Sequence, residues 1–175
     1  MEKSYKTYLS QITTFIFDVD GVLTDGRVLI TSEGDLLRTM NIQDGYAIKT
    51  AIQKEYNICI ITGGTNEGVR QRLKGLGVKD INLGAHNKVE ILEEYLENNH
   101  ILPEHVLYMG DDIPDIPAMQ QVKLACAPQN AAPEVKAICT YISHKNGGEG
   151  CVRDVVEQVL KARGDWFQNF SAAND

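Results

Sequence analysis

An apolar run near the start of the chain ends in two aspartates, and this arrangement constrains the fold more than any other part of the sequence. Residues 12–17 read Ile-Thr-Thr-Phe-Ile-Phe, which is typical of a buried parallel strand. Asp18 and Asp20 follow directly, at the end of the strand where open α/β sheets bind ligands. Because buried charge is costly unless it is paired or metal-bound, these carboxylates need a partner. Taken alone, they are equally consistent with helix-capping aspartates in a loop.

Strand-like runs alternate with helical patterns through the rest of the chain, which predicts an α/β fold. We expect a Rossmann-like, mainly parallel sheet with helices on both faces, formed by a single domain over residues 1–175. The expected core strands are residues 57–62, 80–83, 106–109, 124–127 and 141–143. The expected helices are residues 44–55, 67–76, 87–98, 133–138 and 151–163. Residues 27–41 hold two apolar runs around a turn-rich segment, typical of a protruding β-hairpin.

The composition excludes several classes of protein. The net charge is −7 without a basic cluster, which argues against a nucleic-acid partner. No apolar run is long enough to span a membrane, and the amino-terminal residues lack the apolar core of a signal peptide. The four cysteines are widely separated, which favours reduced thiols over disulfides or zinc ligands. We therefore expect a cytoplasmic protein that contacts neither membrane nor nucleic acid.

Polar side chains follow three of the predicted core strands. They are Asp18 with Asp20, then Thr62, then Asp111 with Asp112. Because the strands are expected to be parallel, these side chains project from one edge of the sheet, and Lys88, which opens a helix, can reach the same edge. Each residue alone has an ordinary structural explanation, but their coincidence at strand ends favours a functional site.

These residues resemble the motifs of the haloacid dehalogenase superfamily of phosphotransferases. The resemblance spans residues 12 to about 153 and rests on Asp18-x-Asp20-Gly21-Val22-Leu23-Thr24-Asp25, Thr62-Gly63, Lys88 and Gly110-Asp111-Asp112-x-x-Asp115. It implies the haloacid dehalogenase fold and phosphate ester hydrolysis through an aspartyl phosphate. Asp18 would be the nucleophile, and Asp20 would protonate the leaving alkoxide and then activate water. Thr62 would hydrogen-bond the phosphoryl group, and Lys88 would neutralise it.

The same resemblance implies a magnesium site. Asp18, Asp111 and the backbone carbonyl of Asp20 would bind Mg²⁺, while Asp112 and Asp115 would orient these ligands or hold a metal-bound water. Oxygen ligands favour Mg²⁺ over zinc. The ion would also supply positive charge that an acidic protein needs next to an anionic substrate.

Two further segments narrow the resemblance. Residues 41–48 and the glycine-rich residues 147–153 are similar to the 3-deoxy-D-manno-octulosonate 8-phosphate phosphatase family, whose members release a sugar acid for lipopolysaccharide synthesis. By this resemblance the substrate-binding residues are Asn41, Asp44, Gly63, Gly64 and Arg70. Asn41 and Asp44 can alternatively cap the helix that they precede. Gly64 and Glu149 depart from the usual pattern, which leaves open a nine-carbon 2-keto-3-deoxy sugar acid 9-phosphate as substrate.

The spacing of the motifs leaves no room for a separate cap domain. The resemblance therefore implies a homotetramer in which neighbouring subunits supply the lid. C-terminal segments of family members reach a neighbour's site, and whether the tail of this chain does so stays open. Apolar residues in the hairpin 27–41 support association, because they would be a liability on the surface of a monomer. Two alternatives remain: a capless phosphatase with another substrate, such as a nucleotide or a phosphoprotein, and a non-catalytic oligomerisation module of the same fold.

Overall fold

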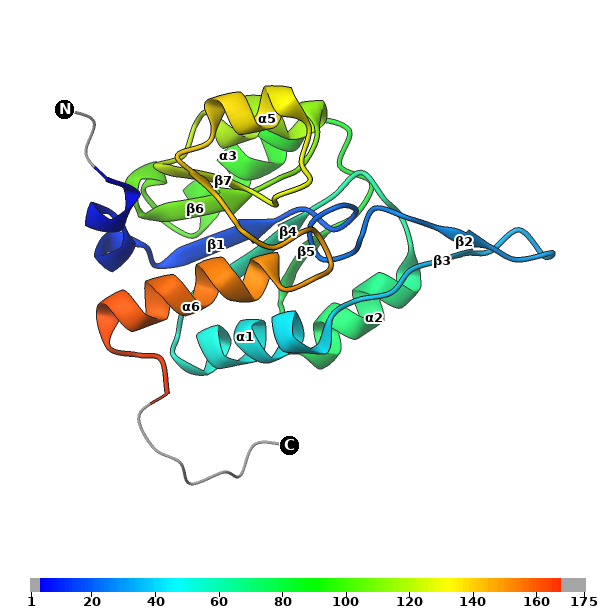
Figure 1. The fold of residues 1–175 in the computed structure, drawn as a ribbon, viewed down its shortest axis with the longest axis horizontal. Coiled ribbons are helices and arrows are strands. Elements are labelled where there is room, and N and C mark those ends of the chain that lie inside the picture. The colour runs from blue at the N-terminus through cyan, green and yellow to red at the C-terminus, as the bar shows by residue number, and fades with distance from the viewer. Residues whose placement is uncertain (1–3, 168–175) are drawn as a thin grey trace.

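Six parallel strands form the central sheet in the computed structural model, which describes residues 4–167 (Figure 1). The strand order is β5-β4-β1-β6-β7-β8, and every neighbouring pair is parallel. The strands are β1 (Thr14–Phe17), β4 (Asn57–Ile61), β5 (Asp80–Asn82), β6 (Val106–Met109), β7 (Leu124–Ala127) and β8 (Tyr141–Ile142). The predicted parallel α/β sheet is confirmed.

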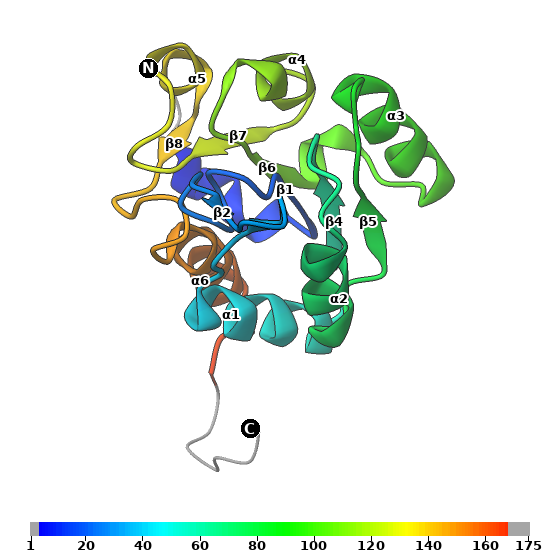
Figure 2. The ribbon, with the colours of Figure 1, turned by 90° about the vertical axis from the view of Figure 1, so that its right-hand side faces the viewer.

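Helices cover both faces of the sheet (Figure 2). One layer consists of α1 (Ile42–Gln53), α2 (Glu67–Gly75) and α6 (Cys151–Arg163), and the other of α3 (Lys88–Asn98), α4 (Ile116–Met119) and α5 (Pro133–Ile138). Short 3₁₀ turns are η1 (Tyr5–Thr7), η2 (Leu9–Gln11), η3 (Pro103–His105) and η4 (Ile113–Asp115). Because side chains alternate along a strand, Phe15 and Phe17 join the core under α1 and α6, whereas Ile16 joins the core on the opposite face.

Three helices begin directly after an asparagine. The side chains of Asn41, Asn66 and Asn87 accept hydrogen bonds from backbone N–H groups in the first turns of α1, α2 and α3. The cap at Asn41 explains why α1 begins at Ile42, two residues before the helix predicted from apolar spacing alone. The helical part of the prediction is otherwise confirmed to within about two residues.

A two-stranded hairpin extends from the body of the protein (Figure 1). Strands β2 (Leu29–Ile30) and β3 (Leu36–Leu37) are antiparallel, with Leu29 opposite Leu37 and Ile30 opposite Leu36. Leu29 is 69% exposed and Ile30 is 66% exposed. The predicted hairpin is confirmed, although its ladder is shorter than the two sequence runs suggest.

Strand β1 lies where the chain changes direction across the sheet. From β1 the chain first forms β4 and β5 on one side and then returns to form β6 on the other side. The loops after β1 and β6 therefore diverge at the carboxyl edge, which creates the crevice where open α/β sheets bind ligands. No helix within residues 4–167 is both long and apolar enough to cross a membrane.

Candidate active site

The polar residues that follow β1, β4 and β6 meet at one edge of the sheet. Phe17 pairs with Ile60 on one side and with Met109 on the other, so these three strands end at nearly the same level. Asp18 and Thr62 follow their strands directly and are buried. The Thr62 hydroxyl donates a hydrogen bond to the Asp18 carboxylate. The structure thus brings together the strand-end residues that the sequence singled out.

Lys88 reaches the same edge from the first position of α3, where the Asn87 cap fixes the start of the helix. Its Nζ atom lies 3.0 Å from Oδ2 of Asp18 and 2.7 Å from Oδ1 of Asp115. All three charged groups are buried. Because a buried carboxylate is costly without a counter-charge, Lys88 stabilises two carboxylates with one ammonium group.

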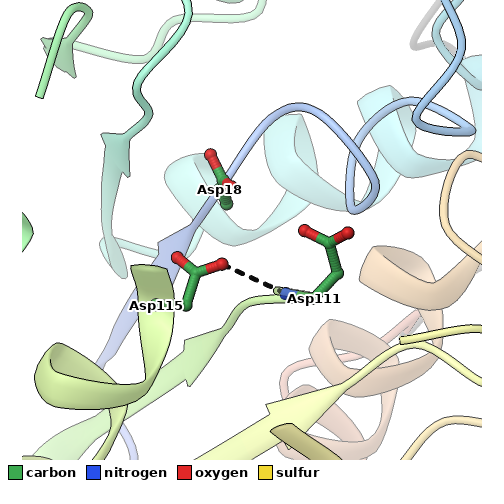
Figure 3. A group of neighbouring side chains, drawn as sticks. All are labelled: Asp18, Asp111 and Asp115. Carbon is green, nitrogen blue, oxygen red and sulfur yellow. Dashed lines mark hydrogen bonds between the residues drawn. The ribbon is translucent and has the colours of Figure 1, made fainter. Parts of the chain in front are cut away.

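Asp18, Asp111 and Asp115 form an acidic group that fits a metal ion (Figure 3). Each offers a carboxylate oxygen, and these oxygens all lie within 4.8 Å of one another. Oδ2 of Asp115 accepts a hydrogen bond from the backbone N–H of Asp111 at 3.2 Å, which orders the loop that carries Asp111. Gly21 leaves room for Asp111, because a Cβ at that position would lie 2.0 Å from its Oδ2. A ligand set made only of oxygens suits Mg²⁺.

The electrostatics of this group also favour a cation. Burial, with the charge of Asp115, raises the pKa of Asp18 against the opposing effect of Lys88. Burial and the neighbouring carboxylates, Asp18 foremost, raise the pKa of Asp111 to about 7. Burial acts to lower the pKa of Lys88, but Asp18 and Asp115 outweigh it and raise that pKa. One ammonium therefore faces three carboxylates, and a divalent cation would offset the remaining negative charge.

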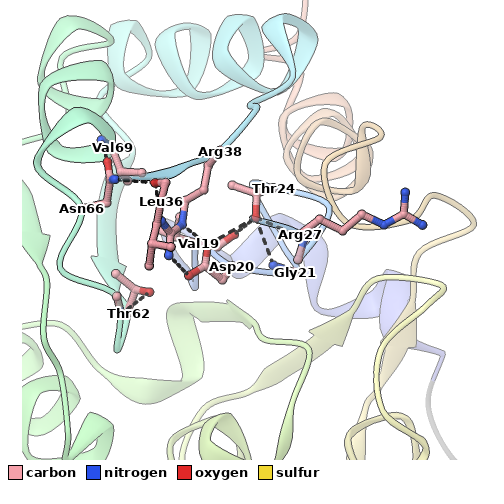
Figure 4. A network of polar contacts seen from close by, with 12 residues as sticks. Val19, Asp20, Gly21, Thr24, Arg27, Leu36, Arg38, Thr62, Asn66 and Val69 are labelled. Carbon is pink, nitrogen blue, oxygen red and sulfur yellow. Dashed lines mark hydrogen bonds and ion pairs between the residues drawn. The ribbon is translucent and has the colours of Figure 1, made fainter. Parts of the chain in front are cut away.

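The side chain of Asp20 meets Arg38, a residue of the hairpin segment (Figure 4). Nε of Arg38 lies 2.7 Å from Oδ1 of Asp20, and Nη2 lies 3.0 Å from Oδ2. The sequence reasoning placed Asp20 in the site but missed Arg38. Its one sequence signal is a cation directly after two apolar residues of the hairpin.

Asp112 and Asp115 were predicted to support the metal ligands together, but they occupy different environments. Asp115 is 1% exposed and contacts Lys88. Asp112 is exposed and accepts a hydrogen bond from the N–H of Ile113, which caps η4. The structure therefore brings Asp115, rather than Asp112, into the acidic group with Asp18.

The residues predicted to bind substrate are spread around the edge of the site. Gly64 is close to the Asp20–Arg38 pair, since a Cβ there would lie 3.3 Å from Oδ2 of Asp20. Gly63 is exposed on the same loop. Arg70 lies further along α2 and donates to the carbonyl of Ile81 at 3.1 Å. Of these three, Gly64 lies nearest to the residues that follow β1.

Asn41 and Asp44, also predicted to bind substrate, contact the segment before and within α6. Nδ2 of Asn41 donates to the carbonyl of Gly148 at 3.3 Å. Oδ1 of Asp44 accepts from the N–H of Arg153 at 2.7 Å, whereas its buried Oδ2 has no hydrogen-bond partner among residues 4–167. Asp44 is 1% exposed, and burial raises its pKa to about 6 against the opposing effect of backbone hydrogen bonds, that from Arg153 foremost. Asn41 thus connects the start of α1 to the glycine loop, residues 147–150, and Asp44 connects α1 to the start of α6.

The glycine loop packs directly against the loop that follows β1. A Cβ at Gly147 would lie 1.8 Å from the carbonyl oxygen of Gly21, so only glycine fits there. The N–H of Gly148 donates to the carbonyl of Val22 at 2.9 Å. The glycine loop therefore helps to set the path of the backbone between Asp18 and Asp25.

Comparisons with known proteins agree with this geometry. Residues 77–154 match the family described as haloacid dehalogenase-like hydrolase. The chain is 37% identical over 158 residues to the 3-deoxy-D-manno-octulosonate 8-phosphate phosphatase of Salmonella typhi, which covers 90% of this chain and 84% of the relative.

Two solved structures show the same fold at similar identity. The 3-deoxy-D-manno-octulosonate 8-phosphate phosphatase of Yersinia pestis is 33% identical with a TM-score of 0.89, covering 91% of this chain and 86% of that chain. The enzyme of that name from Moraxella catarrhalis, in complex with magnesium, phosphate and KDO, is 33% identical with a TM-score of 0.89, covering 92% of each chain.

The fold and the strand-end aspartates define a haloacid dehalogenase-like hydrolase. Within that class the chain belongs to the 3-deoxy-D-manno-octulosonate 8-phosphate phosphatase family. The family resemblance recognised from the motifs is thus confirmed.

Proposed function

We propose that the protein hydrolyses 3-deoxy-D-manno-octulosonate 8-phosphate to the free sugar acid and inorganic phosphate, in a reaction that requires Mg²⁺. The buried contact of Lys88 with Asp18 and Asp115 carries this proposal, because it places a cation beside a strand-end carboxylate. The names of the relatives support the substrate, and the bound magnesium, phosphate and KDO of the Moraxella catarrhalis enzyme support the chemistry. The sugar acid would then serve lipopolysaccharide synthesis.

In this proposal Asp18 is the nucleophile. A carboxylate oxygen of Asp18 forms a bond to phosphorus while the bond from phosphorus to the sugar oxygen breaks. Asp20 gives a proton to the departing oxygen and then takes one from the water that hydrolyses the aspartyl phosphate. Thr62 donates a hydrogen bond to the phosphoryl group. A carboxylate and a phosphate repel each other by about 4 kcal/mol for each pair of unit charges at 4 Å and an effective dielectric of 20. The ammonium group of Lys88 counters this repulsion.

The acidic group fits the metal that this chemistry needs. Asp18 and Asp111 would hold Mg²⁺ with their carboxylates, and Asp20 with its backbone carbonyl, while Asp115 orders the Asp111 loop. When bound, Mg²⁺ would reduce the charge repulsion between the substrate and the protein. Asp112 is the weaker candidate for a supporting role, because its side chain is exposed and caps η4.

The proposal includes a homotetramer in the cytoplasm. Between β1 and β4 the chain forms only the hairpin and α1, so we propose a single domain without a cap and a lid supplied by neighbouring subunits. The exposed apolar residues of β2 and β3 support association through the hairpins. Free cysteines at positions 59, 126, 139 and 151 are consistent with a reducing compartment.

The absence of a side chain at Gly64 supports a second candidate substrate. Gly64 lacks a side chain beside Asp20 and Arg38, where the family commonly has a long charged residue, and this favours a larger ligand such as a nine-carbon sugar acid 9-phosphate.

A panel of phosphate esters tests both proposals. The eight-carbon and nine-carbon sugar acid phosphates, a nucleotide, a phosphopeptide and p-nitrophenyl phosphate are incubated with protein and Mg²⁺, and free phosphate is measured. We expect the highest kcat/KM for the eight-carbon ester. Preference for another ester would overturn that choice of substrate, and no release from any ester would favour a non-catalytic oligomerisation module.

A further inference from the structure

We propose that Arg38 is a positioning residue that holds the carboxylate of Asp20 in the orientation from which it serves the leaving group. This inference rests on the proposed function, because Asp20 acts as acid and base only there. Arg38 belongs to the hairpin, and the ion pair joins it to a residue 18 positions earlier in the loop after β1 (Figure 4). The hairpin would therefore contribute to the active site of its own subunit as well as to assembly.

The contact between the Arg38 guanidinium and the Asp20 carboxylate restricts both the position and the orientation of that carboxylate. Two parallel contacts of 2.7 Å and 3.0 Å join the guanidinium to the two oxygens of Asp20. Such a bidentate contact fixes the plane of a carboxylate, which a single contact cannot do. The Arg38 side chain is only 10% exposed, whereas that of Asp20 is 37% exposed. Arg38 thus holds the carboxylate from a largely buried position, while the Asp20 side chain stays partly accessible to solvent.

Arg38 is itself held in place by the base of the hairpin. Its Nη1 atom donates to the carbonyl of Leu36 at 3.1 Å. The same carbonyl accepts a hydrogen bond from Nδ2 of Asn66 at 3.0 Å, and Asn66 caps α2. The base of the hairpin is therefore attached to two segments that flank the site, the loop after β1 and the amino end of α2. The hydrogen bond with Asp20 also raises the pKa of Arg38.

The chemistry of the leaving group gives this role a specific signature. A sugar alkoxide leaves poorly without a proton, whereas p-nitrophenolate leaves readily without one. Misplacing a reacting group by about 1 Å can cost on the order of 10²-fold in rate. Loss of Arg38 is therefore expected to slow hydrolysis of the sugar phosphate much more than hydrolysis of p-nitrophenyl phosphate.

The test compares Arg38→Gln, Arg38→Lys and wild-type protein on both substrates at saturating Mg²⁺. For Arg38→Gln we expect kcat on the sugar phosphate to fall on the order of 10- to 10²-fold. The kcat on p-nitrophenyl phosphate is expected to fall clearly less, because its leaving group needs no proton and only the activation of water still depends on Asp20. Arg38→Lys keeps the charge but not the bidentate contact, so we expect a smaller selective loss. Arg27→Gln is the matched control, since Arg27 starts the other arm of the hairpin and extends away from Asp20 (Figure 4).

Parallel measurements on Asp20→Asn separate this inference from the function on which it rests. A selective loss in Asp20→Asn but not in either Arg38 variant would overturn the inference and leave the proposed function intact. No selective loss in Asp20→Asn would overturn the acid–base role of Asp20 and, with it, the inference. An equal loss on both substrates, a change confined to KM, or a higher kcat in the folded Arg38 variants would also overturn it. Arg38→Lys decides the matter if Arg38→Gln does not fold.

Discussion

The ammonium nitrogen of Lys88 lies 3.0 Å from Oδ2 of Asp18, and both side chains are buried at the carboxyl edge of the sheet. Asp115 contacts the same ammonium at 2.7 Å. One cation thus holds the proposed nucleophile and a neighbouring carboxylate close together. The Asn87 cap makes Lys88 the first residue of α3. It thereby fixes the point at which the Lys88 side chain leaves the helix.

Replacing Lys88 removes the positive charge beside Asp18 without a large change in volume. For Lys88→Met we expect kcat to fall on the order of 10²- to 10³-fold, comparable to the loss of one group that stabilises charge in a transition state. Steady-state phosphate release measures the effect, with Lys74→Met, an exposed lysine on α2, as the control. Turnover of a folded Lys88→Met protein at the wild-type rate would show that this cation is dispensable.

Asp111 and Asp112 are neighbours with different expected effects on metal binding. Asp111→Asn removes a charge from the acidic group, so we expect the dissociation constant for Mg²⁺ to rise on the order of 10-fold or more. Asp112→Asn retains an oxygen that can accept from Ile113, so the affinity is expected to change little. Calorimetric titration of Mg²⁺ into each variant measures both constants. Equal losses in the two variants would contradict the assignment of Asp111 as a ligand.

Asp44 makes the stability of the protein depend on pH. Burial raises its pKa from an ordinary 3.8 to about 6 in the folded protein. Below about pH 4 the Asp44 carboxyl group is protonated in both the folded and the unfolded state, so it does not make the free energy of unfolding depend on pH. Between about pH 4 and 6 the folded state keeps a proton that the unfolded chain has lost, so the free energy of unfolding decreases as pH rises.

The variant Asp44→Asn isolates this effect because asparagine stays neutral. We expect its free energy of unfolding, relative to wild type, to increase between pH 4 and 6 by up to about 3 kcal/mol. Urea unfolding in the presence of a chelator at several pH values measures the difference. Asp35→Asn, at the exposed turn of the hairpin, serves as the control. A difference independent of pH would mean that Asp44 titrates alike in both states.

The exposed apolar residues of the hairpin lead to a prediction about the association of subunits. Ile30 and Leu37 are 66% and 48% exposed in the single chain, so lysine at both positions is tolerated by the fold but disrupts an apolar interface. We expect Ile30→Lys/Leu37→Lys to dissociate the proposed tetramer in analytical ultracentrifugation and to depress activity on the sugar phosphate more than on p-nitrophenyl phosphate. Leu102→Lys, an exposed leucine outside the hairpin, is expected to leave the tetramer intact. A wild-type protein that sediments as a fully active monomer would defeat the proposal of a shared lid.

Much of the fold could be predicted from local sequence because its signals are local. The apolar run before Asp18 identifies β1, and alternating strands and helices identify a parallel sheet. The strand-end positions of Asp18, Thr62 and Asp111 follow from the same reasoning, since parallel strands share a carboxyl edge. Lys88 was placed correctly because it opens a helix that begins at that edge.

The contacts that the sequence could not supply join segments far apart in the chain. Arg38 reaches Asp20 only because the hairpin folds back over the loop after β1. Asp44 was read as a substrate-binding or capping residue of its own helix, but its carboxylate accepts from Arg153 at the start of α6. Asp112 and Asp115 look equivalent in the sequence, and only the capped turn between them makes one exposed and the other buried.

The most direct test of the account is detection of a phosphoryl group on Asp18. Protein with Mg²⁺ is mixed with excess 3-deoxy-D-manno-octulosonate 8-phosphate, quenched in acid within the first turnover and digested for mass spectrometry. We expect a phosphorylated peptide that contains Asp18, and neither this species nor steady-state phosphate release in a folded Asp18→Asn variant. Phosphate release that persists in Asp18→Asn, or in excess chelator, would contradict the mechanism.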